Sequence, residues 1–262
     1  MSSGPPAESI KHPNVVSCRV ASFDGVEIHY DLWDGTSRSL VLVVPGFWRD
    51  RRHPSMTRLA QFLNAAGYRC AIVDVRGHGD SGGQYGFNLH EHYDVAAVAE
   101  DVLRRFPIES ITLLGFSYGG AIAIATAARH KLPIASLLLV SPVADFAMIV
   151  PRLNPFTVHR HLAFRQALRR PRFDWIRVRR SAKLRALDDI QDVHAPVCFV
   201  HVKDDWLISH NHSLALHEHA HDPKECHILD VSGNYHADRI FSVASDAIEP
   251  IVTAFLEKYT LR

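Results

Sequence analysis

Runs of apolar residues alternate with amphipathic stretches along most of the chain. Alternating polarity over residues 17–22 and 26–33, on either side of Phe23-Asp24-Gly25, predicts a β-hairpin with an Asp-Gly turn. Continuous apolar runs predict strands that are buried on both faces, at residues 40–44, 68–75, 111–114, 134–140, 196–202 and 226–231. Helical spacing predicts helices at about residues 54–66, 88–105, 121–128, 209–221 and 237–258.

This alternation of strands and helices is typical of the α/β class. It predicts a mainly parallel sheet of about eight strands with helices on both faces, and ligands of such sheets bind beyond the carboxyl ends of the strands. Residues 143–190 break the alternation with prolines, aromatic residues and dense arginine, which predicts a short helical cap inserted into the core. We therefore expect a flexible arm at residues 1–15, a core formed by residues 16–142 and 191–262, and a cap at residues 143–190.

A glycine-rich turn joins a predicted strand to a predicted helix at Gly115-Phe116-Ser117-Tyr118-Gly119. Such a tight turn forces Ser117 into a strained backbone conformation, and only glycine at positions 115 and 119 leaves room for it. The serine hydroxyl is then held at the start of a helix, where the helix dipole favours developing negative charge. The pattern predicts a nucleophile at Ser117; the alternative is a glycine-rich turn with an incidental serine.

Two later loops contain the partners that a serine nucleophile needs, a base and an acid that orients the base. The strand at residues 196–202 is followed by Asp204 and Asp205, and the last strand is followed by a loop that contains His236. Serine, acid and histidine thus occur in the order that is typical of one class of hydrolase. Either aspartate fits this pattern, and each is also a residue type that is common in turns and at helix N-caps.

These motifs resemble the α/β-hydrolases, in the serine-hydrolase branch that includes monoacylglycerol-lipase-like, cinnamoyl-esterase-like and S33-aminopeptidase-like proteins. The resemblance extends from about residue 18 onward and rests on the turn at Ser117, the turn at residues 74–81 and the two late loops. It implies that Ser117 is the nucleophile, His236 the general base and Asp205 the acid. Asp204 remains an alternative for the acid, because Val202 stands where the family pattern has glycine. Asp145, shortly after the preceding strand, is a further alternative, because some relatives draw the acid from there.

The same resemblance implies an oxyanion hole formed by the backbone N–H groups of Phe47 and Tyr118. Pro45 stands where the family usually has histidine, but the donor is a backbone group one step past Gly46. In the turn at residues 74–81, Arg76 and His78 are expected to brace the loops rather than to act in catalysis.

Serine rather than aspartate at the turn favours acyl transfer through an acyl-enzyme. We therefore expect an enzyme of the carboxylic ester hydrolase type, with a small-molecule ester or thioester as its substrate. A peptidase or amidase, an acyltransferase, or a non-enzymatic binding protein with the same fold are the alternatives.

Composition and charge restrict the class of protein further. The net charge of +1 over 262 residues argues against a nucleic-acid function, and the sequence contains neither a transmembrane segment nor a secretory h-region. The four cysteines are scattered, which favours reduced thiols and a cytoplasmic location.

Between residues 152 and 185 the chain is strongly basic, with Asp174 as the only acid. This is either a solvated helical face or an attractive field for an anionic substrate, such as a CoA thioester, or an anionic membrane surface.

One further motif, His217-Glu218-His219-Ala220-His221, matches the zinc-protease pattern His-Glu-x-x-His. The surrounding segment is rich in histidine, so a chance match is expected, and Asp222-Pro223 ends the helix at once. We interpret this segment as a surface helix and expect no metal and no cofactor.

Overall fold

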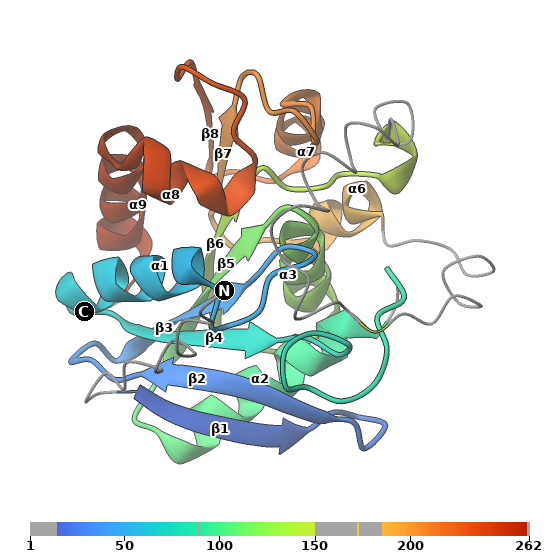
Figure 1. Cartoon of the computed structure of the whole chain (residues 1–262), viewed down its shortest axis with the longest axis vertical. Coiled ribbons are helices and arrows are strands. Elements are labelled where there is room, and N and C mark those ends of the chain that lie inside the picture. The colour runs from blue at the N-terminus through green and yellow to red at the C-terminus, as the bar shows by residue number, and fades with distance from the viewer. Residues whose placement is uncertain (1–14, 88–89, 150–171, 173–184, 261–262) are drawn as a thin grey trace, which may run out of the picture.

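An eight-stranded sheet forms the centre of the molecule in the computed structural model, which describes residues 15–87, 90–149, 172 and 185–260 (Figure 1). The strands are β1 Val15–Ala21, β2 Glu27–Trp33, β3 Ser39–Val44, β4 Arg69–Asp74, β5 Ser110–Phe116, β6 Ile134–Val140, β7 Val197–Val202 and β8 Lys224–Leu229. Their order across the sheet is β1-β2-β4-β3-β5-β6-β7-β8. The pairs β1–β2 and β2–β4 are antiparallel, and all the other pairs are parallel.

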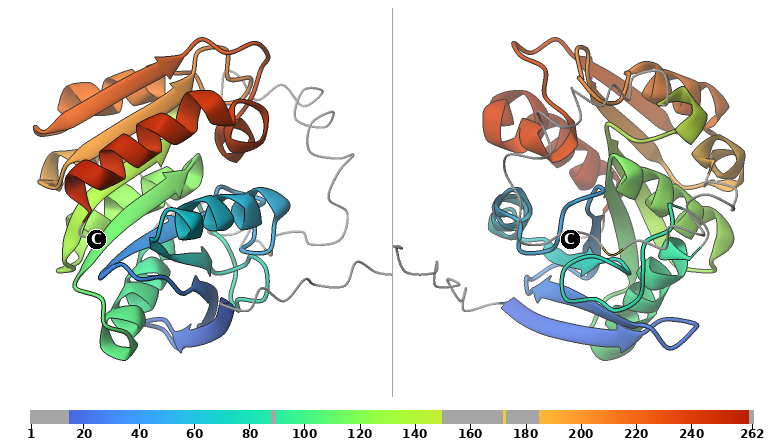
Figure 2. Two further views of the ribbon diagram at one scale, coloured as in Figure 1. Left: turned by 90° about the vertical axis from the view of Figure 1, so that its left-hand side faces the viewer. Right: turned by 45° about the vertical axis from the view of Figure 1, so that its right-hand side comes forward.

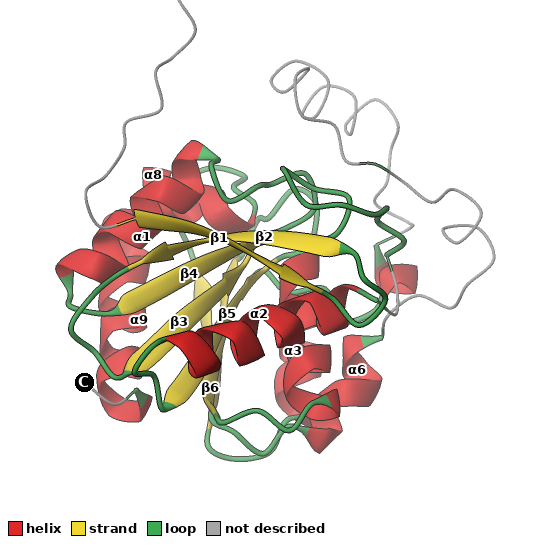
Figure 3. Ribbon diagram, turned by 90° about the horizontal axis from the view of Figure 1, so that it is seen from below, coloured by secondary structure: helices red, strands yellow, loops and turns green. Residues whose placement is uncertain are grey.

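Helices cover both faces of this sheet (Figures 2 and 3). The helices are α1 Pro54–Ala65, α2 Glu91–Arg105, α3 Tyr118–Arg129, α6 Ala186–Asp189, α7 Asn211–His219, α8 Ile240–Val243 and α9 Ser245–Tyr259, with short 3-10 turns at η1 Phe146–Met148, η3 Ile190–Asp192 and η4 Ala237–Arg239. Residues of α2, α3, α6 and α7 pack on one face, whereas residues of α1, α8 and α9 pack on the other. The predicted class, a mainly parallel sheet of about eight strands between two layers of helices, is confirmed.

The continuous apolar runs arise because each central strand is covered on both faces. In β3, Leu40 and Leu42 pack into the core beneath α2 and α3, while Val41 and Val43 pack into the core beneath α1 and α9. All four side chains are fully buried. Complete burial of one such side chain stabilises the fold by about 1.5–3 kcal/mol, so neither face of the strand can accept polar residues cheaply.

The helix predicted at residues 237–258 is wrong as a single element. The structure divides it into η4, α8 and α9, with a non-helical residue at Ala244 (φ −146°, ψ 46°). Apolar residues continue across the break, so their spacing does not reveal it. The next helix begins at Ser245, and the carboxylate of Asp246 lies in its first turn, where the helix dipole favours negative charge.

The predicted flexible arm and most of the predicted cap at residues 143–190 lie outside the described residues, so the division into arm, core and cap stays a prediction. At the end of the predicted cap, α6 packs against α3. There Arg129 makes a two-pronged ion pair with Asp189, at 2.9 and 3.0 Å. Among the described helices, none combines the length and the apolar character that a membrane span requires.

The four cysteines, Cys18, Cys70, Cys198 and Cys226, are all free thiols. Cys70 and Cys198 are fully buried in β4 and β7. The prediction that these two lie in buried strands is therefore confirmed, and their reduced state stays a prediction.

Candidate active site

The turn between β5 and α3 holds Ser117 in a strained backbone conformation, with φ 52° and ψ −122°. Such a conformation costs about 1–3 kcal/mol for a residue other than glycine. A Cβ atom at Gly115 would lie 2.6 Å from the Cα of Gly120, and one at Gly119 would lie 2.3 Å from the carbonyl oxygen of Val44. Both positions therefore require glycine, because the surrounding backbone leaves no room for a side chain. The sequence predicts glycine at these positions for the same reason.

Three side chains from three strand exits form a continuous hydrogen-bonded chain. His236 Nε2 lies 2.9 Å from Ser117 Oγ, and His236 Nδ1 lies 2.8 Å from Asp205 Oδ2. A carboxylate only accepts hydrogen bonds, so His236 donates from Nδ1 and its Nε2 faces the serine hydroxyl as an acceptor. We call Asp205, His236 and Ser117 the Asp–His–Ser chain.

The sequence offers three aspartates as the acid that orients His236, and the structure places them in different environments. Asp205 is buried, and its Oδ1 accepts hydrogen bonds from the backbone N–H groups of Leu207 and Ile208, at 2.9 and 3.0 Å. Asp204 is exposed. Asp145 caps η1 through Ala147 N–H and pairs with an arginine of the predicted cap. Asp205 is thus the aspartate in contact with His236.

A second histidine, His201, lies beside the buried acid. Burial lowers the pKa of His201 to about 4, so its ring is neutral near pH 7. Its Nε2 lies 3.1 Å from the carbonyl oxygen of Ile208, to which it must donate, and 3.7 Å from Asp205 Oδ2. Nδ1 then accepts from Ser213 Oγ at 2.7 Å. We did not predict that His201 would lie beside the acid. Its position at the end of β7, four residues before Asp205, is nevertheless visible in the sequence.

Opposing effects set the charge of Asp205. Burial alone raises the pKa of its carboxyl group, but the neighbouring His236 and His201 and the backbone hydrogen bonds outweigh burial. The pKa of Asp205 therefore lies below its ordinary value. The carboxylate stays ionised at neutral pH and can stabilise a positive charge on His236.

The loop after β3 runs directly beside Ser117. A Cβ atom at Gly46 would lie 3.2 Å from Ser117 Cβ. Phe47 follows Gly46, and Tyr118 is the first residue of α3, whose N–H groups point out of the start of the helix. The structure thus brings the two predicted oxyanion residues to the same rim as Ser117.

His78 braces this loop from the side. Its Nε2 lies 3.3 Å from the backbone nitrogen of Trp48, and its Nδ1 lies 3.3 Å from the carbonyl oxygen of Arg76. Burial lowers the pKa of His78 to about 4, so a neutral ring accepts from Trp48 and donates to Arg76. These contacts agree with the expected structural role of His78.

A partly buried ion pair connects the loop after β3 to the loop of His236. Asp238, two residues after His236, accepts hydrogen bonds from Arg49 Nε at 3.1 Å and from Ser55 Oγ. Only 4% of Asp238 is exposed, whereas 21% of the Arg49 side chain is exposed, so the carboxylate is the buried member of the pair. Sequence analysis missed this link, because no spacing rule joins residue 49 to residue 238.

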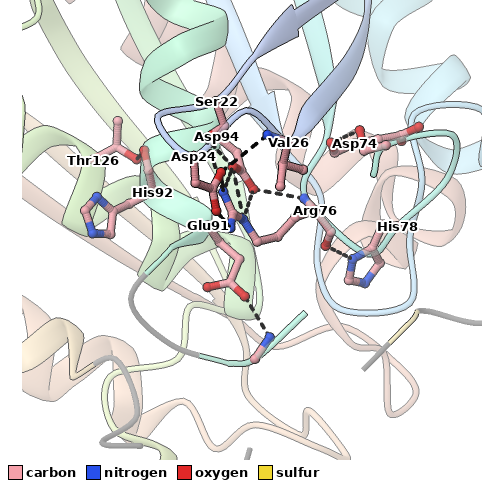
Figure 4. Close-up of polar contacts among 12 residues, drawn as sticks. Ser22, Asp24, Val26, Asp74, Arg76, His78, Glu91, His92, Asp94 and Thr126 are labelled. Carbon is pink, nitrogen blue, oxygen red and sulfur yellow. Dashed lines mark hydrogen bonds and ion pairs between the residues drawn. The ribbon is translucent and has the colours of Figure 1, made fainter. Parts of the chain in front are cut away.

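Arg76 anchors the other side of the turn at residues 74–81, as Figure 4 shows. Its guanidinium group lies between Asp94 and Asp24, with N–O distances of 2.6 and 2.8 Å.

Nearby, Glu91 Oε1 accepts from the backbone N–H of Gly86 at 2.9 Å (Figure 4). The other oxygen of Glu91 is buried and has no hydrogen-bond partner among the described residues. Burial raises the pKa of Glu91 to about 7.

Replacing Glu91 by glutamine is expected to change how stability depends on pH. The wild-type protein binds the Glu91 proton more tightly when folded than when unfolded, so its free energy of unfolding falls as pH rises from 4.5 through about 7. The loss amounts to about 3 kcal/mol, and Glu91→Gln removes it while keeping an acceptor for Gly86 N–H. Urea unfolding at pH 4.5 and pH 8 measures the effect. Equal changes with pH in the two proteins would contradict the prediction.

The helix that the zinc-protease pattern requires is shorter than predicted. α7 ends at His219, and Ala220 has extended backbone angles (φ −73°, ψ 151°). His221 lies beyond the helix, where its Nε2 is 2.7 Å from the carbonyl oxygen of Gln191. The predicted helix at residues 209–221 is therefore too long at its carboxyl end, and the chain turns away before His221 can share a helix face with His217. The expected absence of a metal at this segment stays a prediction.

A mostly parallel sheet with a strained serine turn after its fifth strand defines the α/β-hydrolase class. A family model described as alpha/beta hydrolase fold matches residues 39–173, which is more than half of the chain. The chain belongs to this family.

Curated relatives match shorter parts of the chain. An AB hydrolase superfamily protein of Bacillus subtilis, YisY, is 39% identical over 86 residues, which is 31% of this chain and 30% of that protein. A monoacylglycerol lipase of Mycolicibacterium smegmatis is 31% identical over 136 residues, which is 48% of this chain and 46% of the lipase. The matched regions therefore span less than half of either relative.

Solved structures resemble the whole chain. An esterase of Pyrococcus furiosus has a TM-score of 0.78 at 19% identity, and the likeness covers 97% of this chain and 96% of that one. An esterase of Exiguobacterium antarcticum has a TM-score of 0.69 at 17% identity, covering 92% of this chain and 100% of that one. At these identities the likeness demonstrates a shared fold.

Proposed function

We propose that the protein is a serine hydrolase that cleaves a carboxylic ester or thioester through an acyl-enzyme. The observation that supports this most directly is the Asp–His–Ser chain, with 2.8 and 2.9 Å between its successive polar atoms and Ser117 on a strained turn. A serine hydroxyl is a weak nucleophile, and a histidine oriented by a carboxylate is the arrangement that activates it.

Each residue of the site has one role in the proposed reaction. His236 takes the proton from Ser117 Oγ as that oxygen attacks the substrate carbonyl carbon, and Asp205 stabilises the resulting imidazolium. The backbone N–H groups of Phe47 and Tyr118 bind the negative oxygen of the tetrahedral intermediate. Loss of one such donor typically costs about 3–4 kcal/mol of transition-state stabilisation.

The second half of the reaction regenerates the enzyme. The tetrahedral intermediate collapses, the C–O or C–S bond to the leaving group breaks, and the leaving alcohol or thiol takes the proton from His236. A water molecule then gives its proton to His236 and attacks the acyl carbon. Collapse of the second intermediate releases the carboxylic acid and returns the proton to Ser117.

Two observations support an ester with an apolar acyl group over other substrates. The similar proteins named above include a monoacylglycerol lipase and esterases. In addition, Phe47, Phe87 and Phe146 form a partly exposed aromatic group beside the turn, with ring centroids 4.8 and 5.4 Å apart in successive pairs. Aromatic rings of this kind offer an apolar surface to a substrate.

A substrate panel tests the proposal against the peptidase and acyltransferase alternatives. We expect turnover of short p-nitrophenyl esters and thioesters, slower turnover of aminoacyl amides, and free acid as the main product even when an alcohol acceptor is present. Faster cleavage of amides, or acyl transfer to the alcohol as the main outcome, would contradict the assignment. If the protein cleaved none of the esters, a binding protein with this fold would be favoured.

The predicted contact of the basic segment with an anionic substrate or membrane surface falls largely outside the described residues. Of that segment, Arg172 and Arg185 are described, and Arg185 pairs with Asp145 and Asp188. The contact and the cytoplasmic location both stay predictions.

A further inference from the structure

A group of three potential metal ligands lies on β7 and β8, away from the Asp–His–Ser chain. The group consists of Cys198, Glu225 and His227, and one ligand atom from each lies within 4.8 Å of the other two. Cys198 and Glu225 are directly paired across the two strands, and His227 is two residues further along β8. Because side chains alternate along a strand, Glu225 and His227 point to the same face of the sheet.

We propose that Cys198, Glu225 and His227 bind a zinc-class divalent cation. Thiolate sulphur, imidazole nitrogen and carboxylate oxygen are all established zinc ligands, and three protein ligands leave the fourth tetrahedral position for water. Zinc–ligand bonds of about 2.0–2.3 Å place tetrahedral ligands roughly 3.5 Å apart. Separations of up to 4.8 Å therefore close with small side-chain movements.

The exposure of the three side chains suits such a site. Cys198 is fully buried, whereas 34% of the Glu225 side chain and 36% of the His227 side chain are exposed. The thiol is thus the buried ligand of the group, and the two partly exposed side chains lie on the solvent side, from which a cation would enter. Lys258 Nζ lies 3.3 Å from Glu225 Oε1, but 59% of its side chain is exposed, so it can move into solvent.

Binding at this site has a predictable proton balance. A free cysteine thiol has an ordinary pKa of about 8.5, so the sulphur carries its proton near pH 7 before a metal binds. A zinc ion displaces that proton when it binds the sulphur as thiolate. Each zinc ion bound should therefore release one proton, and affinity should rise with pH.

The place of the site in the sheet determines its effect. β8 is the edge strand, and the cation would join two of its residues to the neighbouring strand β7. Cys198 lies near the amino end of β7, whereas Asp205 follows the carboxyl end of that strand. We therefore expect the cation to stabilise the fold rather than to take part in ester hydrolysis, and this inference does not depend on the proposed function.

The sequence predicts no metal because these ligands do not form a local motif. Cys198 is separated from Glu225 by α7 and its flanking loops, and the two meet only through the pairing of β7 with β8. The histidine-rich segment of α7 is the competing site for added metal, so the experiment must separate the two.

Titration of the purified, tag-free full chain with Co²⁺ and Zn²⁺ tests the proposal. Co²⁺ should produce a thiolate-to-cobalt charge-transfer band in the near ultraviolet, and Zn²⁺ should remove it by competition. Cys198→Ser should abolish the band, and His227→Gln should weaken Zn²⁺ binding at least 10-fold. His227 is partly exposed, so that variant should fold even if Cys198→Ser does not.

Two matched controls isolate the site. Cys226→Ser changes the neighbouring thiol on the opposite face of the sheet, and His217→Gln changes the histidine-rich helix. Both should retain the cobalt band and the wild-type zinc affinity. With zinc at 100 times the wild-type Kd, Tm should rise by about 5 °C in the wild type and in the controls, and by about half of that or less in His227→Gln.

The opposite pattern overturns the proposal. Unchanged zinc affinity in His227→Gln, or a cobalt band that persists in a folded Cys198→Ser protein, would show that the cation binds elsewhere. Loss of binding in His217→Gln alone would assign it to α7. Zinc binding without proton release would show that the thiol is not a ligand.

Discussion

Ser117→Ala is expected to lower kcat for ester hydrolysis by about 10⁴- to 10⁶-fold and to abolish covalent labelling by a fluorophosphonate probe. The variant removes the oxygen that would form the acyl-enzyme, while the backbone N–H groups and the substrate contacts remain. Some acceleration over water should therefore survive. Alanine fits the space of serine, and the wild-type turn already contains a side chain with φ 52° at this position. The fold should be retained, which circular dichroism and thermal unfolding can verify.

A second buried serine at the same rim provides the matched control. Ser141 follows β6, is fully buried with φ 48°, and its hydroxyl has no hydrogen-bond partner among the described residues. Ser141→Ala should keep its activity and its labelling, because it removes a hydroxyl that makes no such bond. Labelling of Ser117→Ala at the wild-type rate would eliminate the proposed nucleophile.

Asp205→Asn is expected to lower kcat by about 10⁴-fold. The asparagine carbonyl oxygen can keep the two hydrogen bonds that Asp205 Oδ1 accepts from the backbone N–H groups of Leu207 and Ile208. Its NH₂ group then faces His236 and donates to Nδ1, which places the histidine proton on Nε2, opposite the serine hydroxyl. The imidazole is held in the wrong tautomer and cannot accept the proton of Ser117.

The neighbouring aspartate makes this experiment specific. Asp204→Asn carries the same chemical change one residue earlier, on an exposed side chain. It should leave kcat and KM close to their wild-type values. A large loss of kcat in Asp204→Asn with little change in Asp205→Asn would reverse the assignment of the acid.

Local sequence determined the class of fold and the turn at Ser117. Continuous apolar runs identify buried strands because residues such as Leu40 and Val41 face two separate cores. The spacing Gly-x-Ser-x-Gly identifies the turn because a side chain at either glycine would collide with neighbouring backbone. Each of these constraints leaves a short, regular spacing in one segment, which makes it visible in the sequence, even though the backbone that excludes a side chain at Gly119 belongs to Val44 and Pro45.

Only the tertiary structure decided the choices that depend on distant contacts. Two adjacent aspartates have nearly the same sequence environment, but only burial against His236 and His201 separates Asp205 from Asp204. The break at Ala244 is likewise absent from the apolar spacing. The link from Arg49 to Asp238 and the group of Cys198, Glu225 and His227 join segments whose separation no motif specifies. These contacts depend on which strands and loops the fold makes neighbours, and no local pattern along the chain records that.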